Sequence, residues 1–204
     1  MIKVCGMRDR DNIHAVAETG IDLMGFIFWQ KSPRCAGKER IEVPSNVAGV
    51  GVFVDEEPGV IADCVVRNGL SYIQLHGNES PDIIRQTKAL LPSDTKVIKA
   101  LSIREADDVK RWRLYADTAD MFLFDTKCKC VGGSGEHFDW TVLSHYDGDI
   151  PFLLSGGIGP DDADRVNNFQ HPQCAGIDLN SRFEIQPGHK DATLIANFIK
   201  KIKQ

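Results

Sequence analysis

The feature that most constrains the fold is the regular alternation of short apolar runs with amphipathic stretches along all 204 residues. Short apolar runs bounded by turn residues are typical of buried strands. The eight candidate strands are residues 2–5, 22–28, 47–54, 72–75, 96–100, 121–125, 151–155 and 175–179. Strands that alternate with helices form parallel sheets, and eight such units close into a barrel. We therefore predict a single-domain, eight-stranded parallel β/α barrel over residues 1–204. An open flavodoxin-like sheet is the alternative, although it would usually need fewer strands.

Helical patterns occupy the segments between the apolar runs. They comprise a helix around residues 13–17, one after the N-cap pair Ser80-Pro81, one after a capping box of Ser102 and Glu105, one opened by Gly159-Pro160, and an amphipathic helix near 191–203. Residues 37–44 hold little helical pattern, so we expect the second connection of the barrel to be short or irregular.

Composition and charge exclude several classes of protein. The net charge of −5 argues against a nucleic-acid-binding surface. No run approaches the ~20 apolar residues of a membrane-spanning helix. The six cysteines are scattered and the first residues lack a signal-peptide pattern, so we expect free thiols in a reducing cytoplasm. Cys128 and Cys130 are too closely spaced for a usual zinc site, and we expect no metal.

Chemically useful residues follow several of the predicted strands. Cys5-Gly6 ends the first run, Asp125-Thr126 ends the sixth, and the seventh opens into Gly156-Gly157. In a β/α barrel the carboxyl ends of all strands meet at one face, and active sites are built there. The sequence therefore predicts an active site at this face.

The ordered motifs at the strand ends resemble those of the phosphoribosylanthranilate isomerase family. They are KVCGMRD (3–9), GFIFWQKSPR (25–34), GVGVFVD (49–55), IQLHGNES (73–80), FLFDT (122–126), GGSGEHFDW (132–140), LSGGIGPDD (154–162) and GIDLNSRFEIQPGHKD (176–191). The resemblance implies a tryptophan-pathway barrel enzyme that performs an Amadori rearrangement of phosphoribosyl anthranilate. It also implies a small phosphosugar substrate and neither cofactor nor metal.

The resemblance assigns Asp125 as the general acid and Cys5 as the general base. Opening a ribosylamine ring requires an acid at the ring oxygen, and the resulting iminium must lose a proton from the neighbouring carbon to a base. Ordinary pKa values of ~8.5 for Cys and ~3.9 for Asp give the reverse protonation arrangement at neutral pH. The site must therefore raise the pKa of the acid, lower that of the base, or use a minor protonation state. Without the resemblance, a small buried apolar residue is the favoured interpretation of Cys5, and the alternative for Asp125 is an N-cap or loop carboxylate.

Four further residues are expected to contact the substrate. The resemblance places Arg34 on the anthranilate carboxylate, which a guanidinium binds bidentately; a solvated surface arginine is the alternative. Gln74 and His76 end the fourth strand and are expected to line the site, although His76 could instead make a structural hydrogen bond. Gly133 lies in the glycine-rich loop 132–135, which we expect to close over the substrate, with a flexible connection as the alternative.

Phosphate binding is expected from two turns. Gly156, Gly157 and Ile158 form the first, and Asn180 and Ser181 form the second at a short helix start. The commonest family pattern has a second serine and then glycine where this chain has Asn180 and Arg182. Which atoms of the second turn bind phosphate is therefore left open, and so is the role of Arg182.

Two lysines in apolar surroundings bear on the competing functions. Lys3 and Lys99 each lie between apolar neighbours, and we expect both to point into the barrel and pair with an acid such as Asp178. A related barrel lyase, indole-glycerol-phosphate synthase, instead uses lysines as acids. Three further functions are alternatives to the isomerase. They are a metal-dependent pentose-phosphate epimerase, an inert barrel that binds phosphometabolites, and an enzyme acting on the bisphosphorylated aminoaldose of the histidine pathway. The sequence is compatible with a monomer or a homodimer.

Overall fold

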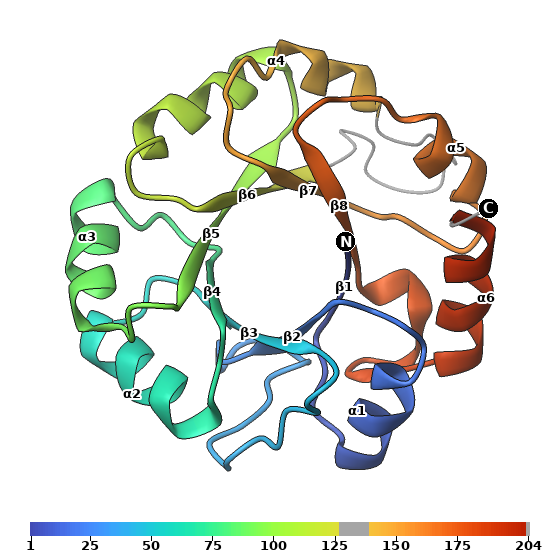
Figure 1. Ribbon diagram of the computed structural model, residues 1–204, viewed down its shortest axis with the longest axis horizontal. Coiled ribbons are helices and arrows are strands. Elements are labelled where there is room, and N and C mark those ends of the chain that lie inside the picture. Colours follow the sequence, from blue (N-terminus) through green and yellow to red (C-terminus); the bar gives the residue numbers. More distant parts are fainter. Residues whose placement is uncertain (127–138, 203–204) are drawn as a thin grey trace.

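The computed structural model describes residues 1–126 and 139–202, and it forms a closed barrel of eight parallel strands surrounded by helices (Figure 1). The strands are β1 (Ile2–Cys5), β2 (Leu23–Ile27), β3 (Ala48–Phe53), β4 (Tyr72–Leu75), β5 (Lys96–Ile103), β6 (Met121–Thr126), β7 (Phe152–Ser155) and β8 (Cys174–Leu179). Each strand pairs with the next in chain order, and β1 pairs with β8 through Lys3 and Asp178. This last pairing confirms the barrel and excludes the open sheet.

The helices cover the outside of the ring. They are α1 (Arg10–Ala17), α2 (Pro58–Asn68), α3 (Pro81–Leu90), α4 (Ala106–Val109), η1 (Lys110–Tyr115), η2 (Trp140–His145), α5 (Ala163–Asn168), η3 (Ser181–Phe183) and α6 (Ala192–Ile202). Residues 28–47 form no helix, as the weak pattern in 37–44 predicted. Within the described ranges, no helix is long and apolar enough to cross a membrane.

Two helix starts were predicted at the wrong residues. Ser102 belongs to β5, which runs three residues beyond its predicted end, and the capping box before α4 is formed by Glu105 and Asp108. Gly159-Pro160 does not open α5, because Asp162 Oδ2 accepts a hydrogen bond from Gly159 N at 2.8 Å and closes a turn there. The helix therefore begins at Ala163.

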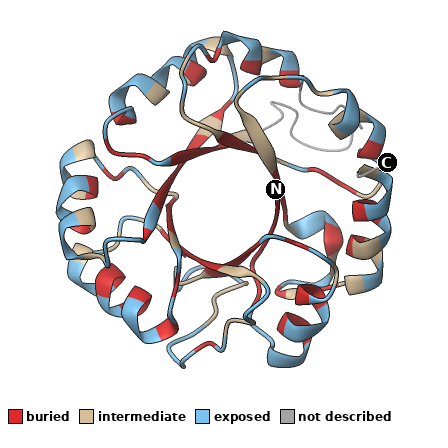
Figure 2. Cartoon of the chain, viewed as in Figure 1, coloured by how far each residue is buried: buried red, intermediate tan, exposed pale blue. Residues whose placement is uncertain are grey.

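The core has two layers separated by the barrel wall. Side chains of Leu23, Val50, Ala100, Leu123 and Leu153 form the cluster inside the ring. A larger cluster lies between the strands and the helices, so the strands are buried on both faces while the helices keep an exposed outer side (Figure 2). This two-sided burial explains why the strands appear in the sequence as continuous apolar runs.

The two buried lysines face opposite sides of the barrel wall. Lys3 lies inside and its Nζ contacts Asp178 Oδ1 at 2.8 Å, as predicted. Lys99 was predicted to face inward as well, and this is wrong. Its neighbours Ile98 and Ala100 belong to the inner cluster, so Lys99 faces the helices, where its Nζ contacts Glu79 Oε2 at 2.8 Å. Alternate residues of a strand point to opposite faces, which fixes this assignment.

Candidate active site

The carboxyl ends of the strands enclose a cavity of about 220 Å³. Its walls are formed by Cys5, Ile27, Val52, Gln74, His76, Asp125, Ser155, Gly156, Gly157, Ile158, Asp178, Asn180, Ser181 and Arg182. Nine residues predicted from sequence to form the site lie in this set. The carboxyl ends of the strands thus bring together residues from opposite ends of the chain, such as Cys5 and Ser181.

Cys5 lies at the end of β1 against a buried ion pair. Its side chain is buried, and burial raises the pKa of the thiol although the neighbouring Lys3 ammonium opposes this. Asp178 Oδ1 accepts from Lys3 Nζ, while its Oδ2 accepts a hydrogen bond from Ser155 Oγ at 3.1 Å. The lysine charge is therefore balanced within the barrel, and burial favours the thiol form of Cys5.

Asp125 faces the same cavity from the end of β6. Its side chain is 18% exposed, and its Oδ2 lies 3.6 Å from His76 Nε2. The other ring nitrogen of His76, Nδ1, lies 3.2 Å from the side-chain nitrogen of Gln74. Gln74 is almost wholly buried, and its Oε1 has no hydrogen-bond partner among the residues that the structure describes. Gln74 therefore supports His76, which in turn faces the carboxylate of Asp125.

The first predicted phosphate turn requires glycine. Gly156 has φ +103°, and a Cβ atom there would lie 2.0 Å from the backbone oxygen of Thr126. Only glycine tolerates this approach and this dihedral angle. The turn brings Gly157 and Ile158 to the cavity wall, which Ser181 and Arg182 of η3 also line.

Asn180 stands at the start of η3, and its side chain makes no capping hydrogen bond to that helix. Its Oδ1 instead accepts a hydrogen bond from Lys190 Nζ at 2.7 Å. Lys190 is buried, and the same ammonium contacts Glu184 Oε1 at 2.7 Å. The buried Lys190 ammonium therefore holds the turn at Asn180 in place.

Arg34 lies beside the cavity rather than among the residues that line it. Its Nε donates to both carboxylate oxygens of Glu184 at 2.8 and 3.0 Å, and its Nη2 donates to Oε2 at 2.7 Å. Its aliphatic stem passes over Gly6, where an added Cβ would lie 2.8 Å from Arg34 Cδ. Gly6 thus allows Arg34 to pack directly beside Cys5, with a side chain 21% exposed.

Some predicted site residues cannot be placed, and two residues beside the cavity were not predicted. Gly133, the loop 132–135 and the Cys128–Cys130 pair lie outside the described residues. The sequence reasoning missed Glu184 and Lys190, although both stand in the motif of residues 176–191. Their signal was a carboxylate and a lysine flanking Pro187-Gly188, a turn that folds β9 (Glu184–Gln186) against β10 (His189–Lys190).

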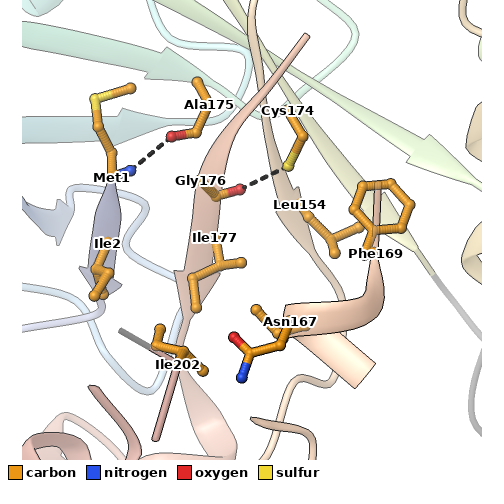
Figure 3. Close-up of a pocket in the computed structure, with 11 residues that line it drawn as sticks. Met1, Ile2, Leu154, Asn167, Phe169, Cys174, Ala175, Gly176, Ile177 and Ile202 are labelled. Atoms are coloured by element: carbon orange, nitrogen blue, oxygen red, sulfur yellow. Dashed lines mark hydrogen bonds between the residues drawn. The ribbon is translucent and has the colours of Figure 1, made fainter. Parts of the chain in front are cut away.

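A second and larger cavity, of about 340 Å³, lies at the opposite end of the barrel (Figure 3). It is bordered by the starts of β1 and β8 and by the C-terminal ends of α5 and α6, and most of the residues that line it are of apolar type. The N-terminal ammonium of Met1 donates to Ala175 O, and Cys174 Sγ contacts Gly176 O at 3.5 Å (Figure 3). Burial raises the pKa of the Cys174 thiol. The predicted acid, base and phosphate turns line the smaller cavity instead, so size does not identify the site.

Comparisons with known proteins point to one family. A family model described as N-(5'phosphoribosyl)anthranilate (PRA) isomerase matches residues 2–201. A Parabacteroides distasonis protein named N-(5'-phosphoribosyl)anthranilate isomerase is 44% identical over 208 residues, covering 99% of this chain and 93% of the relative. A Phocaeicola vulgatus protein of the same name is 43% identical, covering 100% and 98%.

Solved structures give the same result. The Thermotoga maritima phosphoribosyl anthranilate isomerase superposes with a TM-score of 0.83 at 32% identity, covering 99% of this chain and 98% of that one. A phosphoribosyl anthranilate isomerase in complex with reduced 1-(o-carboxyphenylamino)-1-deoxyribulose 5-phosphate superposes with a TM-score of 0.81 at 30% identity, covering 99% and 97%. The chain therefore belongs to the N-(5'-phosphoribosyl)anthranilate isomerase family.

Proposed function

We propose that this protein converts N-(5'-phosphoribosyl)anthranilate to 1-(o-carboxyphenylamino)-1-deoxyribulose 5-phosphate, a step of tryptophan biosynthesis. The observation that carries the proposal is the meeting of Cys5 and Asp125 in one cavity with the turns at Gly156–Ile158 and Asn180–Ser181. The same cavity thus combines an acid and a base with two turns of the kind that bind anions through backbone amides.

The rearrangement requires two proton transfers. Asp125 gives a proton to the furanose ring oxygen while the bond between that oxygen and C1 breaks, which leaves an iminium between C1 and the anthranilate nitrogen. Cys5 then removes the proton from C2, the C–H bonding electrons form the C1–C2 double bond of the enaminol, and the C1–N π electrons return to nitrogen. The enaminol becomes the ketose when C1 gains a proton and the C2 hydroxyl loses one. Protonated Asp125 together with a Cys5 thiolate carries the same number of protons as an Asp125 carboxylate together with a Cys5 thiol. The developing iminium charge favours the thiolate at the moment it is needed.

Arg34 binds the anthranilate carboxylate in this proposal. The aliphatic stem of Arg34 packs against Gly6, next to Cys5, and we place the aromatic ring of the substrate on this side of the cavity. His76 faces Asp125 and stabilises the carboxylate that forms after the first proton transfer. Gly133 is proposed to contact the substrate from the loop that follows β6.

The proposal extends to compartment, organisation and assembly. The cysteines Cys5, Cys35, Cys64 and Cys174 are free thiols, which suits a reducing cytoplasm. Residues 1–204 act as one catalytic domain because the described helices pack on a single barrel. The protein works as a monomer or a homodimer without nucleic-acid or membrane partners; a solved Thermotoga maritima relative is described as dimeric, with monomers generated from it.

The direct test is the fluorescence decay of freshly prepared phosphoribosyl anthranilate on addition of the purified protein. The expected product has the same mass as the substrate, whereas simple hydrolysis releases anthranilate, so mass spectrometry separates the two. Heat-denatured protein is the control. An unaccelerated decay, or release of anthranilate alone, would refute the proposal. A bisphosphorylated aminoaldose assayed in parallel should react poorly, because the described cavity offers turns for one phosphate.

A further inference from the structure

The guanidinium of Arg34 is only partly used by its contact with Glu184. An arginine side chain has five N–H donors arranged on two edges, each of which can hold a carboxylate bidentately. Glu184 occupies the edge formed by Nε and Nη2. No described residue accepts a hydrogen bond from Nη1, so the second edge, formed by Nη1 and Nη2, is available to one more carboxylate.

Glu184 is itself held in a rigid setting. Its side chain is 5% exposed, and its Oε1 accepts from Lys190 Nζ at 2.7 Å and from Gly188 N at 3.0 Å. Lys190 is fixed in turn, because Asn12 accepts from its backbone N–H and donates to its backbone oxygen. Burial disfavours the Glu184 anion, but the bonds from Arg34 and Lys190 outweigh it and lower its pKa to about 2. Glu184 therefore stays charged at every working pH.

The charges in this cluster suit a carboxylate ligand. Arg34 and Glu184 alone would form a neutral pair, which attracts a further anion weakly. Lys190 adds a second buried cation, so the three side chains together carry one net positive charge. That charge is presented at the second edge of Arg34, since Lys190 is covered by Glu184 and Asn180.

We propose that Glu184 is a positioning residue that turns the second edge of Arg34 toward the carboxylate of the substrate. The inference rests on the proposed function, in which Arg34 binds that carboxylate. Glu184 does not touch the substrate; it fixes the direction of the guanidinium, and Lys190 prevents it from cancelling the charge of Arg34. Glu184 thus contributes to the preference for an anthranilate over an aniline that lacks the carboxylate.

The test measures binding of two ligands that differ only in this group. The first is reduced 1-(o-carboxyphenylamino)-1-deoxyribulose 5-phosphate, and the second is its counterpart prepared from aniline. In Glu184→Gln the side chain keeps its size, but one of its two acceptor oxygens is replaced by an amide N–H₂ group, which cannot accept a hydrogen bond from the guanidinium. We expect the carboxylated ligand to bind ~10–100-fold more weakly, because a charge-assisted contact is misdirected. The aniline ligand should bind as in the wild type.

Three comparisons make the result decisive. Arg34→Ala should show the same selective loss, and Arg34→Ala with Glu184→Gln should be no weaker than Arg34→Ala alone, because Glu184 acts through Arg34. Glu79→Gln, which disturbs another buried ion pair, should leave the ratio of the two affinities unchanged. Should Glu184→Gln fail to fold, Glu184→Asp keeps the charge but draws Arg34 back, and the same selective loss is expected.

The failures are distinguishable. If Glu184→Gln, or Glu184→Asp in its place, weakened the binding of both ligands equally, the role of Glu184 would be merely structural and the inference would be overturned. Selective loss in Arg34→Ala without selective loss in the Glu184 variant would overturn it as well, while leaving Arg34 as the carboxylate ligand. If Arg34→Ala itself did not distinguish the two ligands, the proposed role of Arg34 would fail and Glu184 would have nothing to position.

Discussion

Replacing Lys99 with methionine should destabilise the protein strongly while sparing its chemistry. The side chains of Lys99 and Glu79 are each 1% exposed, and Lys99 Nζ also donates to the backbone oxygens of Leu75 and Gly77. Lys99→Met leaves all three acceptors without this donor and leaves one buried charge uncompensated. Removing one partner of a buried pair typically costs ~3–5 kcal/mol. Because Lys99 faces the helices rather than the cavity, the folded variant should keep most of its turnover.

Equilibrium urea unfolding, followed by tryptophan fluorescence, measures this loss. Lys110→Met is the matched control, since its exposed pair with Asp107 should contribute only ~0–1 kcal/mol. Glu79→Gln keeps the oxygen that accepts from Asp55 N and Gly77 N, so it should restore part of the stability lost in Lys99→Met. A loss below ~1 kcal/mol in Lys99→Met, or a further loss on adding Glu79→Gln, would refute the reasoning, since buried pairs cost more than surface pairs when broken.

The pH dependence of the Lys99→Met penalty follows from Glu79. Burial raises the pKa of this carboxyl, but Lys99 and the backbone N–H groups outweigh it and hold the pKa below its ordinary value. In the wild type the ionised Glu79 therefore stabilises the folded protein above the unfolded-state pKa of ~4.3. This stabilisation is lost as the pH falls through the lower pKa of the folded state. Without Lys99, burial dominates and raises the pKa, so the variant loses stability as the pH rises. The difference in unfolding free energy should grow from pH 4 to pH 7; a difference that shrinks would contradict the assignment.

Three shorter predictions concern the site. Arg34→Ala should raise KM with little change in kcat, a loss of ~1.5–3 kcal/mol for one charge-assisted contact, and unchanged steady-state kinetics would remove Arg34 from the site. Sulfate should inhibit competitively and, in a crystal soak, lie between Gly157 and Ser181; density confined to other places would count against the phosphate turns. Asp125→Asn should lower kcat by ~10²–10⁴ because it removes the acid, whereas a drop limited to substrate affinity would contradict that role.

The barrel could be predicted from sequence because each strand is an apolar run with a polar end. β1 and β4 were placed without error, and the closure between β1 and β8 followed from the count of eight. The same two-sided burial concealed the direction of Lys99, because a strand that is apolar on both faces shows no alternation by which inside and outside can be told apart. The β9–β10 hairpin was missed since its strands are only three and two residues long and partly exposed.

The site could be predicted only where position along a strand determined it. Cys5 and Asp125 lie at the carboxyl ends of their strands and Gly156 directly follows one, so the topology of the barrel brings them to one face. The contact between Arg34 and Glu184 joins residues 150 positions apart and has no local pattern to reveal it. The same holds for Lys190 and Asn12, which are 178 positions apart. Such contacts depend on side-chain packing after the fold is formed, which a strand-and-helix pattern does not specify.

Cys5 is proposed as the base of the rearrangement, and the turnover of Cys5→Ala decides whether it is. The rate of phosphoribosyl anthranilate isomerisation is measured for the wild type, for Cys5→Ala and for Cys64→Ala, a control in which another buried thiol, on α2, is removed. We expect turnover to fall by ~10²–10⁴ in Cys5→Ala, with product affinity nearly unchanged, and to stay at the wild-type level in the folded control. Full turnover by Cys5→Ala would show that Cys5 is not the base and make His76 the next candidate.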